Sequence, residues 1–227
     1  MGKSLETLES LSGAQWYNNW LIDQFKEHLS GDILEVGCGI GNFSRQLSSF
    51  GQVFASDINK KYLARIKGEN IKVGFGDIEK GEYFFKGKKF DSIVCLNVLE
   101  HIKDDKRALT NLYNLLKIGG NLILLVPAHK SLYGEIDKAI FHYRRYDKKD
   151  LSIQIKKARL QILFSRRLNF LGGLGWYISG KIFKNRSLDK NKVAIFNLLA
   201  PRFLQLEKFF EPPIGTSILI IARKNRK

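Results

Sequence analysis

Leu34-Glu-Val-Gly-Cys-Gly-Ile-Gly-Asn42 is the stretch of the chain that predicts its fold. It begins inside an apolar segment, 32–36, that is typical of a short β-strand, and it leads into a predicted helix over residues 42–49. Glycines between a strand and a helix permit a sharp turn and a close approach of the backbone to a ligand. Such a loop alone is compatible with a nucleotide, a dinucleotide or a purely structural turn.

The chain alternates between apolar strand-like segments and amphipathic helices. Strands are expected at 32–36, 52–57, 71–75, 90–96, 121–126, 161–164 and 217–222. Helices are expected at 16–28, 42–49, 60–67 and 104–116, the last ended by a left-handed glycine of the pair Gly119-Gly120, and from Asp147 onward, capped by Asp147 and Asp150. This order predicts a doubly wound α/β fold, a parallel sheet with helices on both faces.

The domain organisation expected from these segments is one domain with four parts. They are an N-terminal helical cap (1–30), a ligand-binding core (31–168), a basic helical insertion (169–213), and a last strand with a tail (214–227).

The net charge is +16 over 227 residues, and it is unevenly distributed. Residues 1–150 carry 22 Lys and Arg against 19 Asp and Glu, whereas residues 151–227 carry 16 against 3. A basic surface of this kind favours a polyanionic partner, such as a nucleic acid, an anionic membrane face or a phosphorylated substrate. General solubility of a lysine-rich chain is the alternative explanation.

Cysteine usage and apolar runs bear on the compartment. Cys38 and Cys95 are too few for a disulfide framework, their spacing matches no metal motif, and we expect no metal site. Residues 1–10 lack the apolar run of a secretory signal, and the glycine-interrupted segment 168–183 is too short to span a membrane. We therefore expect a cytoplasmic protein, with peripheral contact at the inner membrane face left open.

Two carboxylates flank the glycine-rich loop and indicate the charge of its ligand. Asp57 ends the second predicted strand about 20 residues after Gly37, where a carboxylate suits the two hydroxyls of a ribose. The loop reads G-x-G-x-G, unlike the dinucleotide fingerprint, and Glu35 before it would repel a pyrophosphate but attract a cation. These features favour S-adenosylmethionine, which has a ribose and a positive charge but no phosphate, over NAD.

Three further segments follow in order: Gly76-Asp-Ile78, Phe90-Asp-Ser-Ile-Val-Cys-Leu-Asn-Val-Leu-Glu-His101 and Leu116-Lys-Ile-Gly-Gly120. Together with the loop they resemble the motifs of class I S-adenosylmethionine-dependent methyltransferases over residues 30–127, with Ile118 replacing the usual proline. The resemblance implies a Rossmann-like, seven-stranded, mostly parallel sheet with a reversed last strand. It also implies S-adenosylmethionine as cofactor and S-adenosylhomocysteine as product.

The same resemblance assigns residues to the cofactor. Asp57 would hold the ribose and Asp77 the exocyclic amine of the adenine. Tyr17, on an aromatic helix that such relatives place over the cofactor, would close the pocket, although core packing is its alternative role. The full expected set is Tyr17, Glu35, Gly37, Cys38, Gly39, Gly41, Asp57, Ile58, Asp77, Ile78, Asn97 and Val98.

Histidines are the expected proton acceptors, because an imidazole suits proton removal from a hydroxyl near neutral pH. His101 follows Glu100 in a Leu-Glu-His run similar to that of ubiquinone-pathway O-methyltransferases, and it is equally compatible with a structural role in the cofactor pocket. His142 lies in a segment, 134–146, that resembles the Asp…His-x-Arg-Arg-Tyr signature of small bacterial methyltransferases associated with polysaccharide genes.

The signature also contains two arginines. We expect Arg145 to join His101 and His142 at the catalytic site, where it or Arg144 would hold a carboxylate or phosphate. A salt bridge between Asp137 and an arginine that fixes the loop is a compatible alternative.

The basic last third of the chain bears on the identity of the methyl acceptor. Aromatic and basic residues alternate between Phe164 and Arg186, including Arg166 and Arg167, which suits an anionic membrane, single-stranded RNA or a flap packed on the sheet. Asn97-Val-Leu-Glu100 lacks the Pro-Pro motif of base-amino methyltransferases, and neither cysteine has the setting of cytosine C5 enzymes. We expect transfer to oxygen of a small, lipid-linked or glycan-type acceptor. RNA ribose methylation and a catalytically silent cofactor-binding partner are the alternatives.

Overall fold

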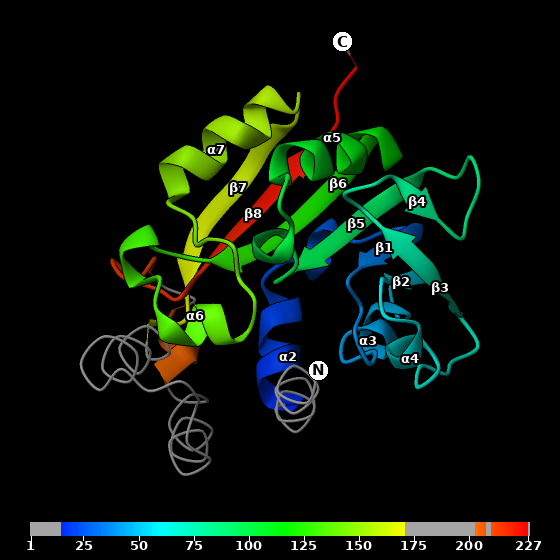
Figure 1. Ribbon diagram of the computed structural model, residues 1–227, viewed down its shortest axis with the longest axis horizontal. Helices are drawn as coiled ribbons and strands as arrows, with labels where there is room; N and C mark the ends of the chain where they lie inside the picture. Colours follow the sequence, from blue (N-terminus) through cyan, green and yellow to red (C-terminus); the bar gives the residue numbers. More distant parts are fainter. Residues whose placement is uncertain (1–14, 171–202, 208–209, 227) are drawn as a thin grey trace.

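The apolar segments of the first half of the chain pair as parallel strands in the middle of one sheet (Figure 1). The computed structural model describes residues 15–170, 203–207 and 210–226. Its strands are β1 (Asp32–Val36), β2 (Gln52–Asp57), β3 (Ile71–Asp77), β4 (Glu82–Tyr83), β5 (Phe90–Leu96), β6 (Leu116–Pro127), β7 (Gln161–Leu168) and β8 (Ser217–Arg223). They lie in the order β4-β3-β2-β1-β5-β6-β8-β7.

The direction of the strands confirms the doubly wound class. β3, β2, β1, β5 and β6 are mutually parallel, and β8 runs antiparallel to β6, from Asn121 opposite Arg223 to Pro127 opposite Ser217. The reversed last strand is therefore confirmed. The sheet has eight strands where seven were expected. The additional strand is β4, whose two residues turn back and pair antiparallel with the end of β3.

The boundary between the expected helix 104–116 and its following strand was wrong. The helix ends at Leu115, and β6 begins at once with Leu116, opposite Phe90, before a register shift near Ser92. Gly119 does adopt a positive φ of 82°, but it does so within the irregular start of β6 and not at the helix end. The hydrogen-bonded pairing with β5 outweighs the local helix propensity of these residues.

The helices are mostly shorter than periodicity predicts. They are α2 (Gln15–Asp23), α3 (Ser44–Leu47), α4 (Lys60–Leu63), α5 (Asp105–Leu115), α6 (Glu135–Ala139) and α7 (Lys148–Lys157). The expected helix 16–28 stops at Asp23, and 26–28 form a separate 3₁₀ turn. Asp104 caps α5 by accepting a hydrogen bond from Arg107 N at 3.0 Å. The Asp147 side chain does not cap α7; it accepts a hydrogen bond from Lys130 N at 3.3 Å instead.

Two apolar cores lie on the two faces of the sheet. α5 and α7 cover one face, where Leu122 and Leu124 of β6 point, and α2, α3 and α4 cover the other, where Ile123 and Leu125 point. Strands buried on both faces read as continuous apolar runs, as β6 does. α2 also extends past the carboxyl ends of the parallel strands, toward the glycine-rich loop (Figure 1).

The expected basic amphipathic segment takes a different form in its first part. β7 is an edge strand, and its Arg166 and Arg167 side chains bond to residues 210–213, which precede β8. Arg166 donates to Phe210 O at 3.0 Å and Arg167 to Pro213 O at 2.9 Å. They hold this segment against the sheet edge. Most of the predicted helical insertion, residues 171–202, lies outside the described residues. Within the part of the chain that the structure describes, no helix is long and apolar enough to span a bilayer.

Leu124→Ala tests the central packing. Leu124 of β6 is fully buried in the core under α5 and α7, so the cavity should lower the free energy of unfolding by about 2–5 kcal/mol in urea titrations. Ile118→Ala is the matched control, since Ile118 is 62% exposed, and its effect should stay within about 0.5 kcal/mol. Equal losses in both variants would contradict this assignment of the core.

Candidate active site

The loops after β1, β2, β5 and β6 meet at the carboxyl edge of the sheet. β1 lies between β2 and β5, so the chain winds in opposite directions from it, and open α/β sheets bind ligands at such a switch point. The sequence-predicted residues after these strands are therefore neighbours, although they are far apart along the chain.

The glycine-rich loop after β1 depends on glycine backbone geometry. Gly37, Gly39 and Gly41 have φ angles of 69°, 54° and 87°. A Cβ on Gly37 would lie 2.3 Å from Val98 Cγ2, so this position excludes any side chain. The Gly37 and Cys38 N–H groups donate to Ser56 O at 2.8 and 3.0 Å, which locks the turn onto the end of β2.

Two carboxylates lie under this loop. Asp57 accepts hydrogen bonds from Gly39 N at 2.9 Å and from Asn59 N at 2.7 Å, and it is 9% exposed. Glu35 is buried, and its carboxylate accepts a hydrogen bond from the Ser44 hydroxyl. Burial, with the neighbouring charge of Asp57, raises the pKa of Glu35 to about 8. Two buried acids beside a glycine turn fit a ligand with a positive charge and ribose hydroxyls, because a nearby cation offsets the cost of ionising a buried carboxyl group.

The residues expected to hold an adenine lie at the ends of β2 and β3. Ile58 is 68% exposed and offers an apolar surface next to Asp57. Asp77 accepts hydrogen bonds from Glu79 N and Lys80 N, both at 3.0 Å, which fixes its carboxylate at the strand end. The Ile78 side chain is buried in the core, so it packs with α5 and β5 and does not face solvent.

The remaining predicted cofactor residues are placed as follows. Asn97 is exposed, has a φ of 53°, and follows β5, while Val98 packs on Gly37. Cys38 is buried, and burial raises the pKa of its thiol. The Tyr17 hydroxyl bonds to the Asn169 side chain and the ring lies 5.5 Å from Trp20, so Tyr17 ties α2 to the end of β7.

A cavity of about 410 Å³ adjoins the same loop. It is bounded by α2, the glycine-rich loop and the turn after α4, with Asn18, Gly41, Arg45 and Ile66 among its lining residues. A second cavity, also about 410 Å³, lies between α5, α7 and residues 128–147, which we call the signature loop.

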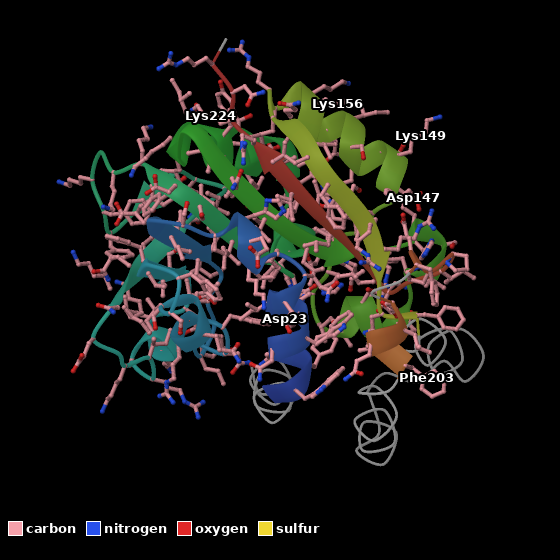
Figure 2. All side chains as sticks on the ribbon, turned by 180° about the vertical axis from the view of Figure 1, so that it is seen from behind. Asp23, Asp147, Lys149, Lys156, Phe203 and Lys224 are labelled. Carbon is pink, nitrogen blue, oxygen red and sulfur yellow. The ribbon has the colours of Figure 1, made fainter. Side chains whose placement is uncertain are left out.

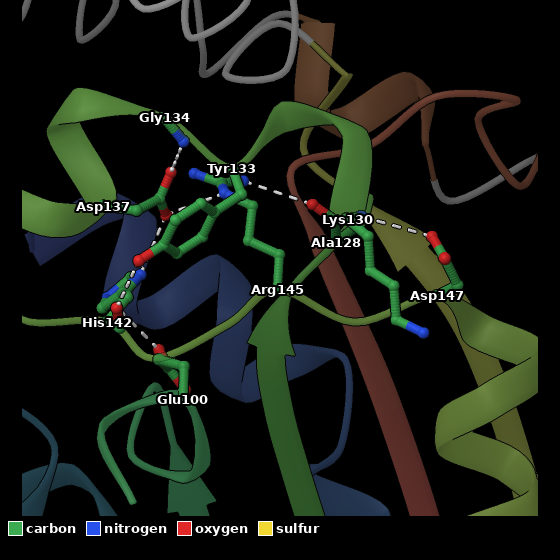
Figure 3. A network of polar contacts seen from close by, with 9 residues as sticks. All are labelled: Glu100, Ala128, Lys130, Tyr133, Gly134, Asp137, His142, Arg145 and Asp147. Carbon is green, nitrogen blue, oxygen red and sulfur yellow. Dashed lines mark hydrogen bonds and ion pairs between the residues drawn. The ribbon is translucent and has the colours of Figure 1, made fainter. Parts of the chain in front are cut away.

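Asp137 organises the signature loop (Figure 3). Its buried carboxylate accepts hydrogen bonds from Gly134 N at 3.0 Å and Arg145 Nε at 2.8 Å, and it pairs with His142 Nδ1 at 3.0 Å. Burial alone would raise the pKa of Asp137, but these partners hold it below its ordinary value. The Asp137–Arg145 salt bridge expected as a loop-fixing contact is therefore present.

Arg145 is 3% exposed and also donates to Ala128 O at 3.2 Å. Arg144 pairs with Asp105 at 2.9 Å and donates to Lys103 O at 2.7 Å. Both guanidinium groups thus hold protein elements together in this structure. Their contacts support a positioning role more directly than a grip on substrate.

Glu100, His101 and His142 come together beside this network. His142 Nε2 lies 3.8 Å from Glu100 Oε1, and the His101 and His142 rings meet edge to face with centroids 4.6 Å apart. The Tyr143 N–H donates to Glu100 O at 2.8 Å and clasps the two loops together. Sequence reasoning left Glu100 out of its catalytic set, although the Leu-Glu-His run pointed at it. It also expected no metal site, whereas these three side chains place ligand atoms within 4.8 Å of one another.

The electrostatics of this cluster follow from burial. The Glu100 side chain is fully buried, which raises its pKa to about 8, with Arg145 opposing the shift. Desolvation, together with the electrostatic effect of the neighbouring His142, lowers the pKa of His101 to about 4, so its imidazole is neutral near pH 7.

Comparisons with known proteins agree with this geometry. Residues 34–124 match the family model described as methyltransferase domain. An uncharacterised protein of Methanocaldococcus jannaschii is 31% identical over 152 residues, covering 66% of this chain and 64% of that protein. A ubiquinone biosynthesis O-methyltransferase of Rickettsia bellii is 30% identical over 118 residues, covering 47% and 48%. Phosphoethanolamine N-methyltransferase 2 of Haemonchus contortus, solved with S-adenosyl-L-methionine, superposes with a TM-score of 0.64 at 18% identity, covering 92% and 52%.

The strand order, the reversed last strand and the glycine-rich loop define a methyltransferase fold of the Rossmann-like type. Over residues 34–124 the chain matches the methyltransferase domain model, and its fold is that of the class I S-adenosylmethionine-dependent methyltransferases. It spans between about half and two thirds of the length of the two curated relatives named above.

Glu35→Gln tests the buried acid. Below the unfolded pKa of about 4.5 the Glu35 contribution is fully present; as pH rises toward the folded pKa of about 8 it is lost, because only the unfolded chain ionises. The wild type should therefore lose up to about 1.4 kcal/mol of stability per pH unit from this group across that window. Urea titrations at pH 5, 6 and 7 should show a flatter pH dependence in the variant. Parallel curves would contradict the raised pKa.

Proposed function

We propose that this protein transfers a methyl group from S-adenosylmethionine to an oxygen of a small, lipid-linked or glycan-type acceptor. The observation that carries the proposal is the Asp137–His142 pair, held at 3.0 Å at the same sheet edge as the glycine-rich loop. The loop supplies the cofactor site and the pair supplies a proton acceptor.

The cofactor would be held by backbone and carboxylate groups. When bound, S-adenosylmethionine supplies an electrophilic methyl group on a sulfonium. The glycine turn offers close backbone approach, Asp57 offers its carboxylate to ribose hydroxyls, and Glu35 under the loop would ionise when a cation binds beside it. The fit rests on two buried carboxyl groups whose described partners are neutral donors, so that a bound cation would favour their ionised forms.

A hydroxyl acceptor must lose its proton, and His142 is placed to take it. Asp137 bonds to Nδ1, which fixes the tautomer so that Nε2 is the free base and faces Glu100 and His101. Arg145 holds Asp137 in turn. This is the arrangement of a base oriented by a third group, with His101 as a neutral neighbour.

The acceptor class is inferred from the surroundings of the signature loop. The second cavity is lined by tyrosines, by Lys106 and Lys130, and by two acids, of which Asp150 pairs with Lys130; the tyrosines are Tyr133, Tyr143 and Tyr146 and the other acid is Asp105. Aromatic faces suit sugar rings, and cations suit a phosphate link.

The outer face of α7 adds further positive charge. Lys149, Lys156 and Lys157 are exposed there, and the first two are labelled in Figure 2. These charges support peripheral contact with an anionic membrane, where a lipid-linked acceptor would be found.

Asp57→Ala tests the cofactor site. Calorimetry should show wild-type binding of S-adenosylmethionine and S-adenosylhomocysteine but not NAD, with affinity falling at least tenfold in the variant because the ribose contact is lost. Asp23→Ala is the matched control, since Asp23 forms an exposed pair with Lys26 on the outside of α2. Absence of binding to either sulfur compound by the wild type would refute the proposal.

His142→Gln tests the proton acceptor. Labelled S-adenosylmethionine is incubated with the wild type and separate lipid, glycan and RNA fractions of a cell extract; label is expected in the lipid or glycan fraction. The variant should transfer about 10²–10⁴ times more slowly while binding S-adenosylhomocysteine normally. Label in RNA alone would favour the ribose methyltransferase instead.

A further inference from the structure

Three side chains from two loops converge on one point at the carboxyl edge of the sheet. Glu100 and His101 come from the 3₁₀ turn after β5, and His142 comes from the signature loop. Each offers one ligand atom, and these atoms all lie within 4.8 Å of one another. Two imidazoles and one carboxylate form the donor set that proteins use for Zn²⁺ with an open coordination position, and for related divalent transition metals.

Glu100 provides an independent sign that a ligand belongs here. Its side chain is completely buried, with 0% of its surface exposed. Neither carboxylate oxygen accepts a hydrogen bond from any residue that the structure describes. His142 Nε2 faces this carboxylate, at 3.8 Å from Oε1. A buried carboxylate without a donor is costly unless it is protonated or binds a cation.

The histidines are held as metal-binding histidines usually are. Metal-ligating imidazoles commonly place their other nitrogen on a carboxylate or backbone carbonyl, which fixes the ring. His142 has Nδ1 on Asp137 at 3.0 Å, with Arg145 behind that carboxylate at 2.8 Å. The His101 ring makes a hydrogen bond with the backbone of Phe141. One nitrogen of each ring therefore remains for the shared point.

We propose that Glu100, His101 and His142 bind one divalent transition-metal ion, with Asp137 and Arg145 as its supporting contacts. Ligand atoms of one such ion lie roughly 3–4 Å apart, so the most widely separated of these atoms must approach by about 1–2 Å. Three protein ligands leave a position open for an oxygen of the acceptor or of water.

The proposal deepens the proposed function and rests on it for the ion's chemical role. An acceptor hydroxyl bound at the open position would lose its proton more readily, because a metal ion lowers the pKa of a bound oxygen. In the metal-bound protein His142 is then a ligand, and the ion takes over the activation that the imidazole provides in its absence.

The experiment uses tag-free full-length protein stripped with chelator. Zn²⁺ is titrated by competition with a chromogenic chelator, and Co²⁺ is added separately to record its visible spectrum. We expect one Zn²⁺ per chain and Co²⁺ bands of a four- or five-coordinate nitrogen and oxygen site. Glu100→Gln and His142→Gln should each weaken Zn²⁺ binding at least tenfold, and Asp137→Asn should weaken it about 10–100-fold.

His28→Gln is the matched control, since His28 lies at the opposite end of β1 and should leave Zn²⁺ binding unchanged. S-adenosylhomocysteine calorimetry on each variant separates the two proposals, because it reports on the cofactor site and on folding without the ion. Stoichiometric binding lost in the cluster variants supports the metal site. No Zn²⁺ binding, or equal binding in wild type and cluster variants, overturns it even if the cofactor binds normally.

Discussion

The contacts of one buried carboxylate determine the shape of the candidate catalytic site. Asp137 joins Gly134, His142 and Arg145, and so it closes the signature loop on itself and aims an imidazole at Glu100. Removing one partner of such a buried ion pair costs about 3–5 kcal/mol, because the other charge is left uncompensated. The Arg145 contact to Ala128 carries the same constraint to the end of β6. These contacts therefore fix the position of His142 relative to the signature loop and to the end of β6.

The glycine-rich loop and the signature loop follow different strands but share one edge. The first needs positive φ angles and a position without a side chain, at Gly37, because Val98 of the loop after β5 packs directly on it. Two residues further along that loop stands Glu100, which Tyr143 holds to the signature loop. The segment 97–101 is thus the physical link between the region for the cofactor and the region for the acceptor.

Much of the fold and of the candidate cofactor site was predictable from the sequence, because the features that determine them are local. The apolar runs of β1, β2 and β5 and the positions of Glu35 and Asp57 follow from patterning and loop chemistry. The β4 turn, the early start of β6 and the short α3 and α4 did not, because tertiary pairing decided them. The convergence of Glu100 with His142 was beyond sequence reasoning for the same cause: their approach depends on the β5–β6 ladder and on Asp137. Arg166 and Arg167 lie on an edge strand, which composition alone does not distinguish from an amphipathic segment.

The central claim is that the cofactor loop and the Asp137–His142 pair serve one reaction centre. A crystal structure with S-adenosylhomocysteine tests it most directly. The account predicts ribose hydroxyls on the Asp57 carboxylate and the thioether sulfur on the side of the site that faces His142 and Glu100. A ligand bound elsewhere, or a sulfur turned away from the histidine with the signature loop closed off behind protein, would contradict it.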